Sequence, residues 1–166
     1  DRNNGNRLGQ FAKGSGIGSF ALLADNRIFH GPADRSGGVM TEAGLSGDRA
    51  ASHVDAVDMI VDAQVMYLLT SNKVTAMTRG SRRLLWSQTV EGGCSMVLAG
   101  RTLYIGSRNK VAAFKVNNGQ VQWKDTVPGN PLGLAVANGA LIASTDSGAI
   151  LSFGQASDYP SAWILY

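Results

Sequence analysis

The sequence LAGRTLYI at residues 98–105 is the clearest copy of a unit that recurs along the chain. The stretch VDAQVMYL at 61–68 precedes it by 37 residues, with the two tyrosines in step. With one-residue slips the unit returns as VANGALIA at 136–143, and a fainter copy, LLADNRIF, lies at 22–29. Four copies at one spacing predict a repeat architecture, in which each unit buries its apolar face against its neighbours.

Each copy predicts short strands. In the clearest one, β-branched and aromatic residues form the strands, while Gly100 and the segment 117–119 (NNG) supply tight turns. A weak helical pattern is confined to residues 48–56. The strands expected in the two best copies are 59–63, 65–70, 73–78 and 83–88, then 95–99, 102–106, 111–116 and 120–125. Four antiparallel strands per unit and a period near 40 are typical of β-propeller blades.

The chain is therefore predicted to be all-β, with about four blades that form one propeller domain or part of one. The first blade is expected to be degenerate, because residues 30–58 are rich in Gly, Ser and Ala and contain no aromatic residue. Such a stretch either carries the specific function or is a tolerated irregularity. The expected segments are a loop at 1–16, a degenerate blade with an inserted loop at 17–58, blades at 59–90 and 91–128, an incomplete last blade at 129–154, and a tail at 155–166.

Composition excludes several classes of protein. The 166 residues are 44% hydrophobic and 16% charged, which does not fit a disordered chain. No stretch approaches the ~20 apolar residues of a membrane span. The net charge of +3 is spread evenly along the chain, which argues against nucleic acid as a partner. The single cysteine, Cys94, excludes an internal disulfide and a multi-cysteine metal site.

The segment AFKVNNGQVQW at 113–123 resembles the tryptophan-docking motif of quinoprotein-type, or PQQ-like, β-propellers. That motif reads Ala-x-Asp-x-x-Thr-Gly-x-x-x-Trp, and here Lys115 and Asn118 replace the Asp and the Thr. The copy that begins at Ala76 keeps the Ala and the Trp but has Arg82 where the motif has Gly. The resemblance therefore implies a propeller in which tryptophans join neighbouring blades.

The resemblance covers residues 17–154 and is strongest over 59–127. An indole at one place in each blade buries ~150–250 Å² against the next blade. A small Ala lets the sheets approach, and Gly permits the turn. The residues expected to dock the blades are Trp86, Trp123, Ala76, Ala113 and Gly119. Stacking of the tryptophans on a ligand is the alternative, although their spacing follows the repeat.

Enzymes of the resembled family bind pyrroloquinoline quinone (PQQ) and calcium on the propeller axis. They typically combine adjacent cysteines, a tryptophan floor and a metal site of Glu, Asn and Asp, whereas Cys94 has no neighbouring cysteine. We therefore expect neither PQQ nor calcium, and we favour a non-catalytic scaffold that binds protein partners, similar to outer-membrane-assembly lipoproteins. The same resemblance implies a periplasmic or otherwise extracytoplasmic location in a bacterium. The alternative is part of a PQQ-dependent dehydrogenase or another redox enzyme, with its active residues outside this chain.

A less specific candidate site includes both histidines. His30 follows a predicted strand, and His53 precedes Asp55 and Asp58, whose carboxylates could orient an imidazole or bind a cation. The spacing is irregular and no nucleophile accompanies these residues. A solvated loop is therefore the simpler interpretation.

The number of blades also predicts a need for partners. Propellers of the resembled type close a ring with seven or eight blades, about twice what this repeat supplies, and open sheet edges favour aggregation. We therefore expect further blades, from the same polypeptide or from a second chain, to pack against both ends. The apolar residues of the tail at 155–166 have no place in the predicted repeat, and we expect them to dock on the propeller or on a partner.

Overall fold

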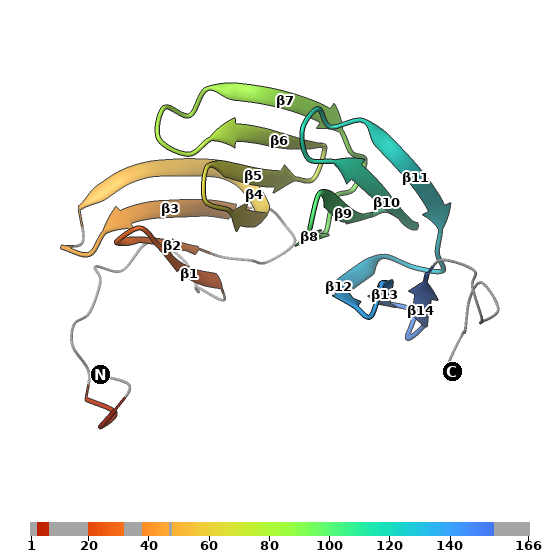
Figure 1. Ribbon diagram of the computed structural model, residues 1–166. Helices are drawn as coiled ribbons and strands as arrows, with labels where there is room; N and C mark the ends of the chain where they lie inside the picture. Colours follow the sequence, from red (N-terminus) through yellow and green to blue (C-terminus); the bar gives the residue numbers. More distant parts are fainter. Residues whose placement is uncertain (1–2, 7–19, 32–37, 47, 155–166) are drawn as a thin grey trace. The chain divides into compact units, whose positions relative to one another are not determined.

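The computed structural model describes residues 3–6, 20–31, 38–46 and 48–154, in which it has fourteen strands and no helix (Figure 1). The chain divides into two compact units, Asp1–Asp55 and Ala56–Tyr166. The strands are β1 (Phe20–Ala24), β2 (Arg27–Gly31), β3 (Gly38–Gly44), β4 (Arg49–Val61), β5 (Val65–Thr70), β6 (Lys73–Thr78), β7 (Leu84–Thr89), β8 (Ser95–Ala99), β9 (Thr102–Ser107), β10 (Lys110–Lys115), β11 (Val121–Thr126), β12 (Pro131–Ala137), β13 (Ala140–Thr145) and β14 (Ile150–Phe153). Strand β4 spans the division between the units.

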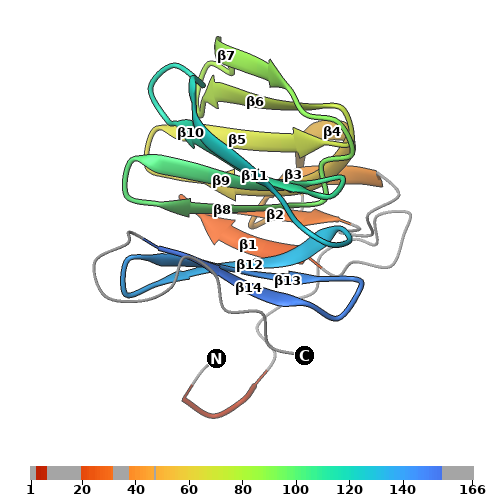
Figure 2. The same ribbon diagram turned by 90° about the vertical axis from the view of Figure 1, so that its right-hand side faces the viewer.

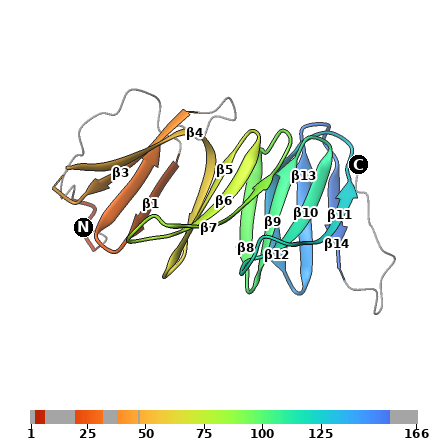
Figure 3. The ribbon, with the colours of Figure 1, turned by 90° about the horizontal axis from the view of Figure 1, so that it is seen from above.

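The second unit is built of three antiparallel sheets that follow one another along the chain. In the first sheet, the later part of β4 pairs with β5, and β6 and β7 follow in order. The second sheet has the order β8-β9-β10-β11, and the third has the order β12-β13-β14. The strands of each sheet follow chain order, as in a propeller blade. Figure 1 shows the sheet β8–β11 between the other two, and in the view of Figure 3 the sheets β8–β11 and β12–β14 overlap beside the strands β5–β7.

The middle sheet is buried on both faces. Side chains alternate between the faces of a strand, so neighbouring residues of β9 contribute to different cores. Leu103 and Ile105 belong to a core shared with the sheet β4–β7, whereas Tyr104 packs against a core shared with the sheet β12–β14. This two-sided burial joins the three sheets of the second unit into one packed body.

The first unit contains β1, β2, β3 and the beginning of β4. The β1–β2 hairpin turns at Asp25 and Asn26, which have φ of 47° and 58°. Two consecutive left-handed residues match a type I′ turn, in which Asp and Asn are well tolerated. Phe29 and Met40 are the largest fully buried side chains of this unit.

The all-β propeller fold that the repeat predicts is confirmed, and the blade strands lie within two residues of their expected positions, with one exception. Strand β4 begins at Arg49 instead of residue 59, so the weak helical pattern at 48–56 lies in an extended strand. The physical reason is that pairing with β3 in the sheet overrides the weak local preference of this segment for helix. The Gly- and Ser-rich stretch 30–58 likewise supplies β3 and most of β4.

Candidate functional site

Trp86 on β7 lies between two neighbouring blades. On its own sheet it faces Ala76 of β6 across the ladder, and its ring centroid is 6.0 Å from that of Tyr67. Its Nε1 donates a hydrogen bond of 2.8 Å to the carbonyl oxygen of Val116 on the next blade. The side chain is 7% exposed and Ala76 is fully buried. Trp86 therefore joins the sheet β4–β7 to the sheet β8–β11.

Gly119 is the residue of the next blade on which Trp86 packs. It follows β10 in the turn to β11 and has φ of 69°, a conformation that L side chains rarely adopt. A Cβ atom built at Gly119 would lie 2.5 Å from Cε3 of Trp86. The turn therefore favours glycine at this position, and the close approach of the indole requires it.

Trp123 on β11 makes the same kinds of contact within its own sheet as Trp86 does. Its contacts with the next sheet are different. It faces Ala113, which is fully buried, and its ring lies 6.2 Å from that of Tyr104. Toward the next blade its ring contacts Phe153, with the two ring centroids 5.7 Å apart. Trp123 is only half-buried, so it is less deeply buried than Trp86 at the equivalent position. A counterpart of the turn at Gly119 would come after Phe153, and the residues beyond Gly154 lie outside the described part of the chain.

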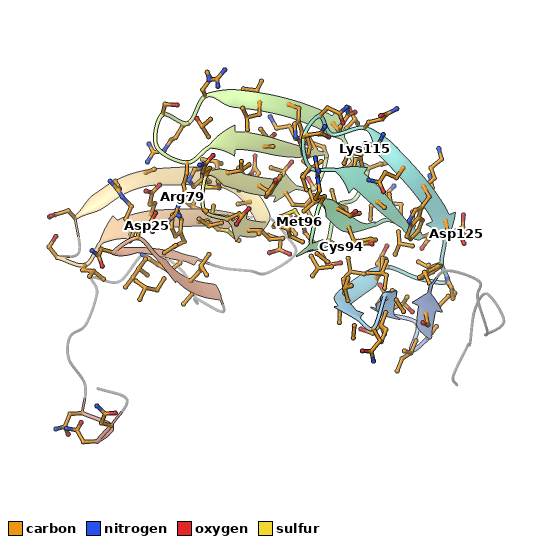
Figure 4. The ribbon with its side chains drawn as sticks, in the orientation of Figure 1. Asp25, Arg79, Cys94, Met96, Lys115 and Asp125 are labelled. Atoms are coloured by element: carbon orange, nitrogen blue, oxygen red, sulfur yellow. The ribbon has the colours of Figure 1, made fainter. Side chains whose placement is uncertain are left out.

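Asp58 on β4 forms a hydrogen bond to β8 of the next sheet, and these are the first strands of two neighbouring blades. Its Oδ2 accepts a hydrogen bond of 2.9 Å from the backbone N–H of Met96 on β8, and its Oδ1 accepts one of 2.7 Å from the N–H of Met59. Burial raises the pKa of this carboxyl to about 6, although both hydrogen bonds act in the opposite direction. Figure 4 shows Met96 on β8, the first strand of its sheet, and Asp125 on β11, the last strand of the same sheet. Asp58 is therefore part of the contact between blades.

Ser95 makes the corresponding contact at the next interface, 37 residues further along the chain. Its hydroxyl donates a hydrogen bond of 2.5 Å to the carbonyl oxygen of Pro131, and the Cys94 thiol lies 3.2 Å from the same oxygen. Strand β12, which begins at Pro131, lies beside β8 and β9 (Figure 2). The only cysteine in the sequence thus contacts the backbone of the neighbouring blade.

The candidate site predicted around the histidines is divided by the structure. His30 is half-buried on β2, and His53 is buried on β4, with β3 between those two strands in the sheet. Asp55 is exposed with φ of 58°, whereas Asp58 belongs to the second unit. Within the described part of the chain, no group of three His, Cys, Asp or Glu side chains is placed to bind a metal. No described helix is long and apolar enough to cross a membrane.

Sequence reasoning missed an exposed apolar surface on the outer strand of the first complete blade. Leu84 and Leu85 are 59% and 40% exposed, and they follow two exposed arginines, Arg82 and Arg83. We call these four residues the β7 surface. Among the described residues, β7 is the last strand of its sheet, so no described strand pairs with its backbone at that edge. The signal in the sequence was the RRLL run just before Trp86, since only alternate residues of this strand can face the core.

The repeated blades and their tryptophan contacts define the class of protein: the chain is a β-propeller built of PQQ-like repeats. Within that class it belongs to the family described as outer membrane protein assembly factor BamB, whose model matches residues 1–163. No curated protein matches the sequence.

Several solved structures have the same fold. The computationally designed Ika4 protein matches with a TM-score of 0.73 at 13% identity, over 90% of this chain and 98% of that chain. The designed Ika8 protein matches with a TM-score of 0.69 at 11% identity, over 93% of this chain and 48% of that chain. BamB from Moraxella catarrhalis matches with a TM-score of 0.63 at 16% identity, over 80% of this chain and 41% of that chain. The chain therefore spans about two fifths of that BamB chain.

Proposed function

We propose that this chain is a non-catalytic propeller scaffold to which other proteins bind during the assembly of outer membrane proteins. The proposal includes an extracytoplasmic, periplasmic location in a bacterium. Family membership supports both parts, because the matching family is described as an outer membrane protein assembly factor. Fold similarity alone would not support a function, since one fold hosts many.

The observation that carries the proposal is the β7 surface. Two consecutive leucines are exposed on a strand whose tryptophan is firmly packed, so the surface is held by a rigid blade. Exposed apolar residues beside an open sheet edge are a typical place for a protein partner to bind, by side-chain contact and strand addition. Arg82 and Arg83 add positive charge at the start of the same strand. A partner segment with apolar and acidic side chains fits this combination.

A complementation experiment tests the proposal. In a bacterial strain that lacks the gene, the full-length protein with Leu84→Asp and Leu85→Asp should reach normal levels but fail to restore the amount of folded outer membrane proteins. The matched control is Leu45→Asp, which changes a leucine that is 53% exposed in the first unit. Full complementation by the double variant, or recovery of the protein in the cytoplasmic fraction, would contradict the proposal.

The alternative, part of a PQQ-dependent dehydrogenase, is tested separately on the purified full-length protein. We expect no saturable change in quinone absorbance on titration with PQQ, and no rise in melting temperature on addition of calcium. A ligand that binds only the folded state raises its stability, so binding of either one would be visible in the melting curve. Such a rise would favour the enzyme over the scaffold.

A further inference from the structure

The turns of the second unit lie at two opposite ends of its sheets, because neighbouring strands run antiparallel. The backbone N–H of Arg79 donates to the carbonyl oxygen of Gln64, so the turns β4–β5 and β6–β7 share one end. In the next sheet the N–H of Val116 donates to the carbonyl oxygen of Arg101, which joins the turns β8–β9 and β10–β11. The hydrogen bond from Trp86 to Val116 places the turns of both sheets at the same end. These turns are 62–64, 79–83, 100–101 and 116–120.

Charged residues are divided unequally between the two ends. Within residues 56–154, these turns and the strand residues next to them have five basic residues and one acidic residue: Arg79, Arg82, Arg83, Arg101, Lys115 and Asp62. The connections at the opposite end and the strand residues next to them have three basic and two acidic residues: Lys73, Arg108, Lys110, Glu91 and Asp146. A salt bridge of 3.3 Å joins Arg108 to Glu91 there. The excess positive charge therefore lies at the first end, although it is spread evenly along the chain.

Four of these basic residues are exposed, and we call them the basic end: Arg82, Arg83, Arg101 and Lys115. Hydrogen bonds fix their backbone, because the carbonyl oxygen of Arg83 accepts one of 2.9 Å from Thr78 and that of Arg101 accepts one of 3.3 Å from Val116. The Nζ of Lys115, which Figure 4 labels, donates a hydrogen bond of 3.1 Å to Oε1 of Gln120. The charges are therefore held on structured turns.

The basic end spans the contact between the two complete blades. Trp86 donates its hydrogen bond to the carbonyl oxygen of Val116, and Lys115 is the residue before Val116. Arg83 precedes Trp86 by three residues, which is about 10 Å of extended strand. Since Val116 is also bonded to Arg101, the long side chains of three basic residues surround one point of the interface.

The chemistry of these turns fits a polypeptide better than a nucleic acid. Arginine binds carboxylates through two parallel hydrogen bonds. Asn117, Asn118 and Gln120 are exposed beside the basic end, and their amide groups both donate and accept hydrogen bonds, as a peptide backbone requires. The four turns contain no aromatic residue, whereas proteins that bind single-stranded nucleic acids stack the bases on aromatic side chains.

We propose that the basic end binds an acidic segment of a partner protein across the contact between the two complete blades. The proposal deepens the scaffold function proposed above, and it rests on that function for the kind of partner. Carboxylates of the segment pair with the basic side chains of both blades, so binding weakens as the salt concentration rises.

A binding experiment with the full-length protein tests the proposal. Fluorescence anisotropy measures the affinity for a fluorescein-labelled polyglutamate peptide, and Arg101→Glu with Lys115→Glu should weaken binding at least about tenfold, because attraction becomes repulsion. The matched control is Lys73→Glu with Lys110→Glu, which makes the same change of charge at the opposite end of the same blades. A strand of six residues spans about 20 Å, more than twice the Debye length of about 8 Å at physiological salt. The control should therefore change affinity by less than about twofold.

The neutral variant Arg101→Gln with Lys115→Gln is a milder version of the same test and should weaken binding about threefold. Thermal unfolding confirms that each variant is folded at the temperature of the titration. Three results would overturn the proposal: no saturable binding by the unmodified protein, equal losses at the two ends, or tighter binding of oligothymidine than of polyglutamate. The last result would assign the basic end to nucleic acid.

A further variant separates this proposal from the one that concerns the β7 surface. Leu84→Ser with Leu85→Ser removes the apolar part of that surface without changing any charge, and it should bind polyglutamate within about twofold of the unmodified protein. A greater loss would assign the peptide to the β7 surface and overturn the proposal. Normal binding by Arg101→Glu with Lys115→Glu would overturn this proposal alone, because neither residue belongs to the β7 surface.

Discussion

Trp86 and Trp123 occupy the same place in successive repeats, yet their surroundings differ. Each faces a buried alanine and lies about 6 Å from a tyrosine of its own blade. Across the interface, Trp86 is held by the Val116 carbonyl and by the turn at Gly119, whereas Trp123 meets Phe153 and stays half-buried. The repeat sequence thus determines the partners within a blade, and the neighbouring blade determines how deeply the tryptophan is buried.

The first strands of the blades differ between the same two interfaces in the hydrogen bonds that they form to the next blade. Asp58 accepts a hydrogen bond from a backbone N–H, and Ser95, at the equivalent position, donates one to a backbone carbonyl. One interface therefore contains a carboxyl whose charge depends on pH, and the other contains a neutral hydroxyl. Substitutions at both interfaces should reveal how far these differences affect stability.

The largest effect is expected at Trp86. Trp86→Ala should lower the free energy of unfolding by about 3–5 kcal/mol, because it removes a buried indole and leaves a cavity between two blades. Trp123→Ala should cost about 1–3 kcal/mol, since this ring is already partly in contact with water. Urea unfolding of both variants measures the two values. A greater loss at Trp123 than at Trp86 would show that burial does not distinguish the two interfaces.

Trp86→Phe separates the hydrogen bond from the packing. Phenylalanine keeps most of the apolar contact but has no Nε1 to donate to Val116, so it should cost about 1–2 kcal/mol from the lost hydrogen bond and volume. Trp123→Phe removes no hydrogen bond of this kind and should cost less. Equal costs for the two substitutions would argue against a role of the Val116 contact.

The next effect is expected at the turn on which Trp86 packs. Gly119→Ala should cost about 2–4 kcal/mol, since the left-handed backbone and the contact with the indole both oppose a Cβ atom. Gly100→Ala is the matched control, because it has φ of 58° and nothing within 4 Å of its Cβ position. It should cost only about 1–2 kcal/mol, from the backbone alone.

Combining Gly119→Ala with Trp86→Ala sharpens this comparison. If the methyl group acts through the indole, the double variant should lose less stability than the sum of the two single variants. Strict additivity would show that the cost at Gly119 comes from the backbone conformation alone.

Much of this arrangement can be predicted from the sequence, for a physical reason. A strand period of two and a repeat of 37 residues together place Ala76, Trp86, Ala113 and Trp123 on equivalent strands and faces before any coordinates are known. The turn at Gly119 could be predicted because few residues tolerate its conformation. Local patterns of this kind depend on residues close together in the chain.

Contacts between blades could not be predicted in the same way. The hydrogen bond from Met96 to Asp58 joins residues 38 apart, and no local pattern indicates it. Strand β3 and the early part of β4 were missed because their Gly, Ala and Ser residues have low strand propensity, which tertiary pairing overrides. The partial exposure of Trp123 depends on the neighbouring blade, and not on its own repeat.

A moderate effect that depends on pH is expected at Asp58. Because its pKa is raised to about 6 in the folded protein, the folded state binds this proton more readily than the unfolded state does between about pH 4 and pH 6. Stability should therefore fall as the pH rises through this window, by about 1–3 kcal/mol from this group. Unfolding measured at intervals of pH gives the slope.

Asp58→Asn should remove that part of the slope, because an amide does not titrate. Asp125→Asn, at an exposed position on β11, is the control and should leave the slope as it is. At the equivalent position of the next interface, Ser95→Ala should lower stability by about the same amount at every pH, since the serine hydroxyl does not titrate. An unchanged slope in Asp58→Asn would contradict the assignment to this carboxyl.

The smallest effect is expected for Arg82→Gly, at the turn that corresponds to the turn at Gly119. These residues are 37 apart and both have left-handed backbones, with φ of 54° and 69°. Glycine relieves a conformational cost of about 1–2 kcal/mol at Arg82 but adds up to about 1 kcal/mol of backbone entropy to the unfolded chain. Arg82→Gly should therefore leave stability unchanged or raise it by less than about 1 kcal/mol. The reverse exchange, Gly119→Arg, should be strongly destabilising, because here the indole of Trp86 fills the space. Thermal unfolding of both variants tests this asymmetry, and a loss of more than about 1 kcal/mol in Arg82→Gly would show that the arginine side chain itself stabilises the turn.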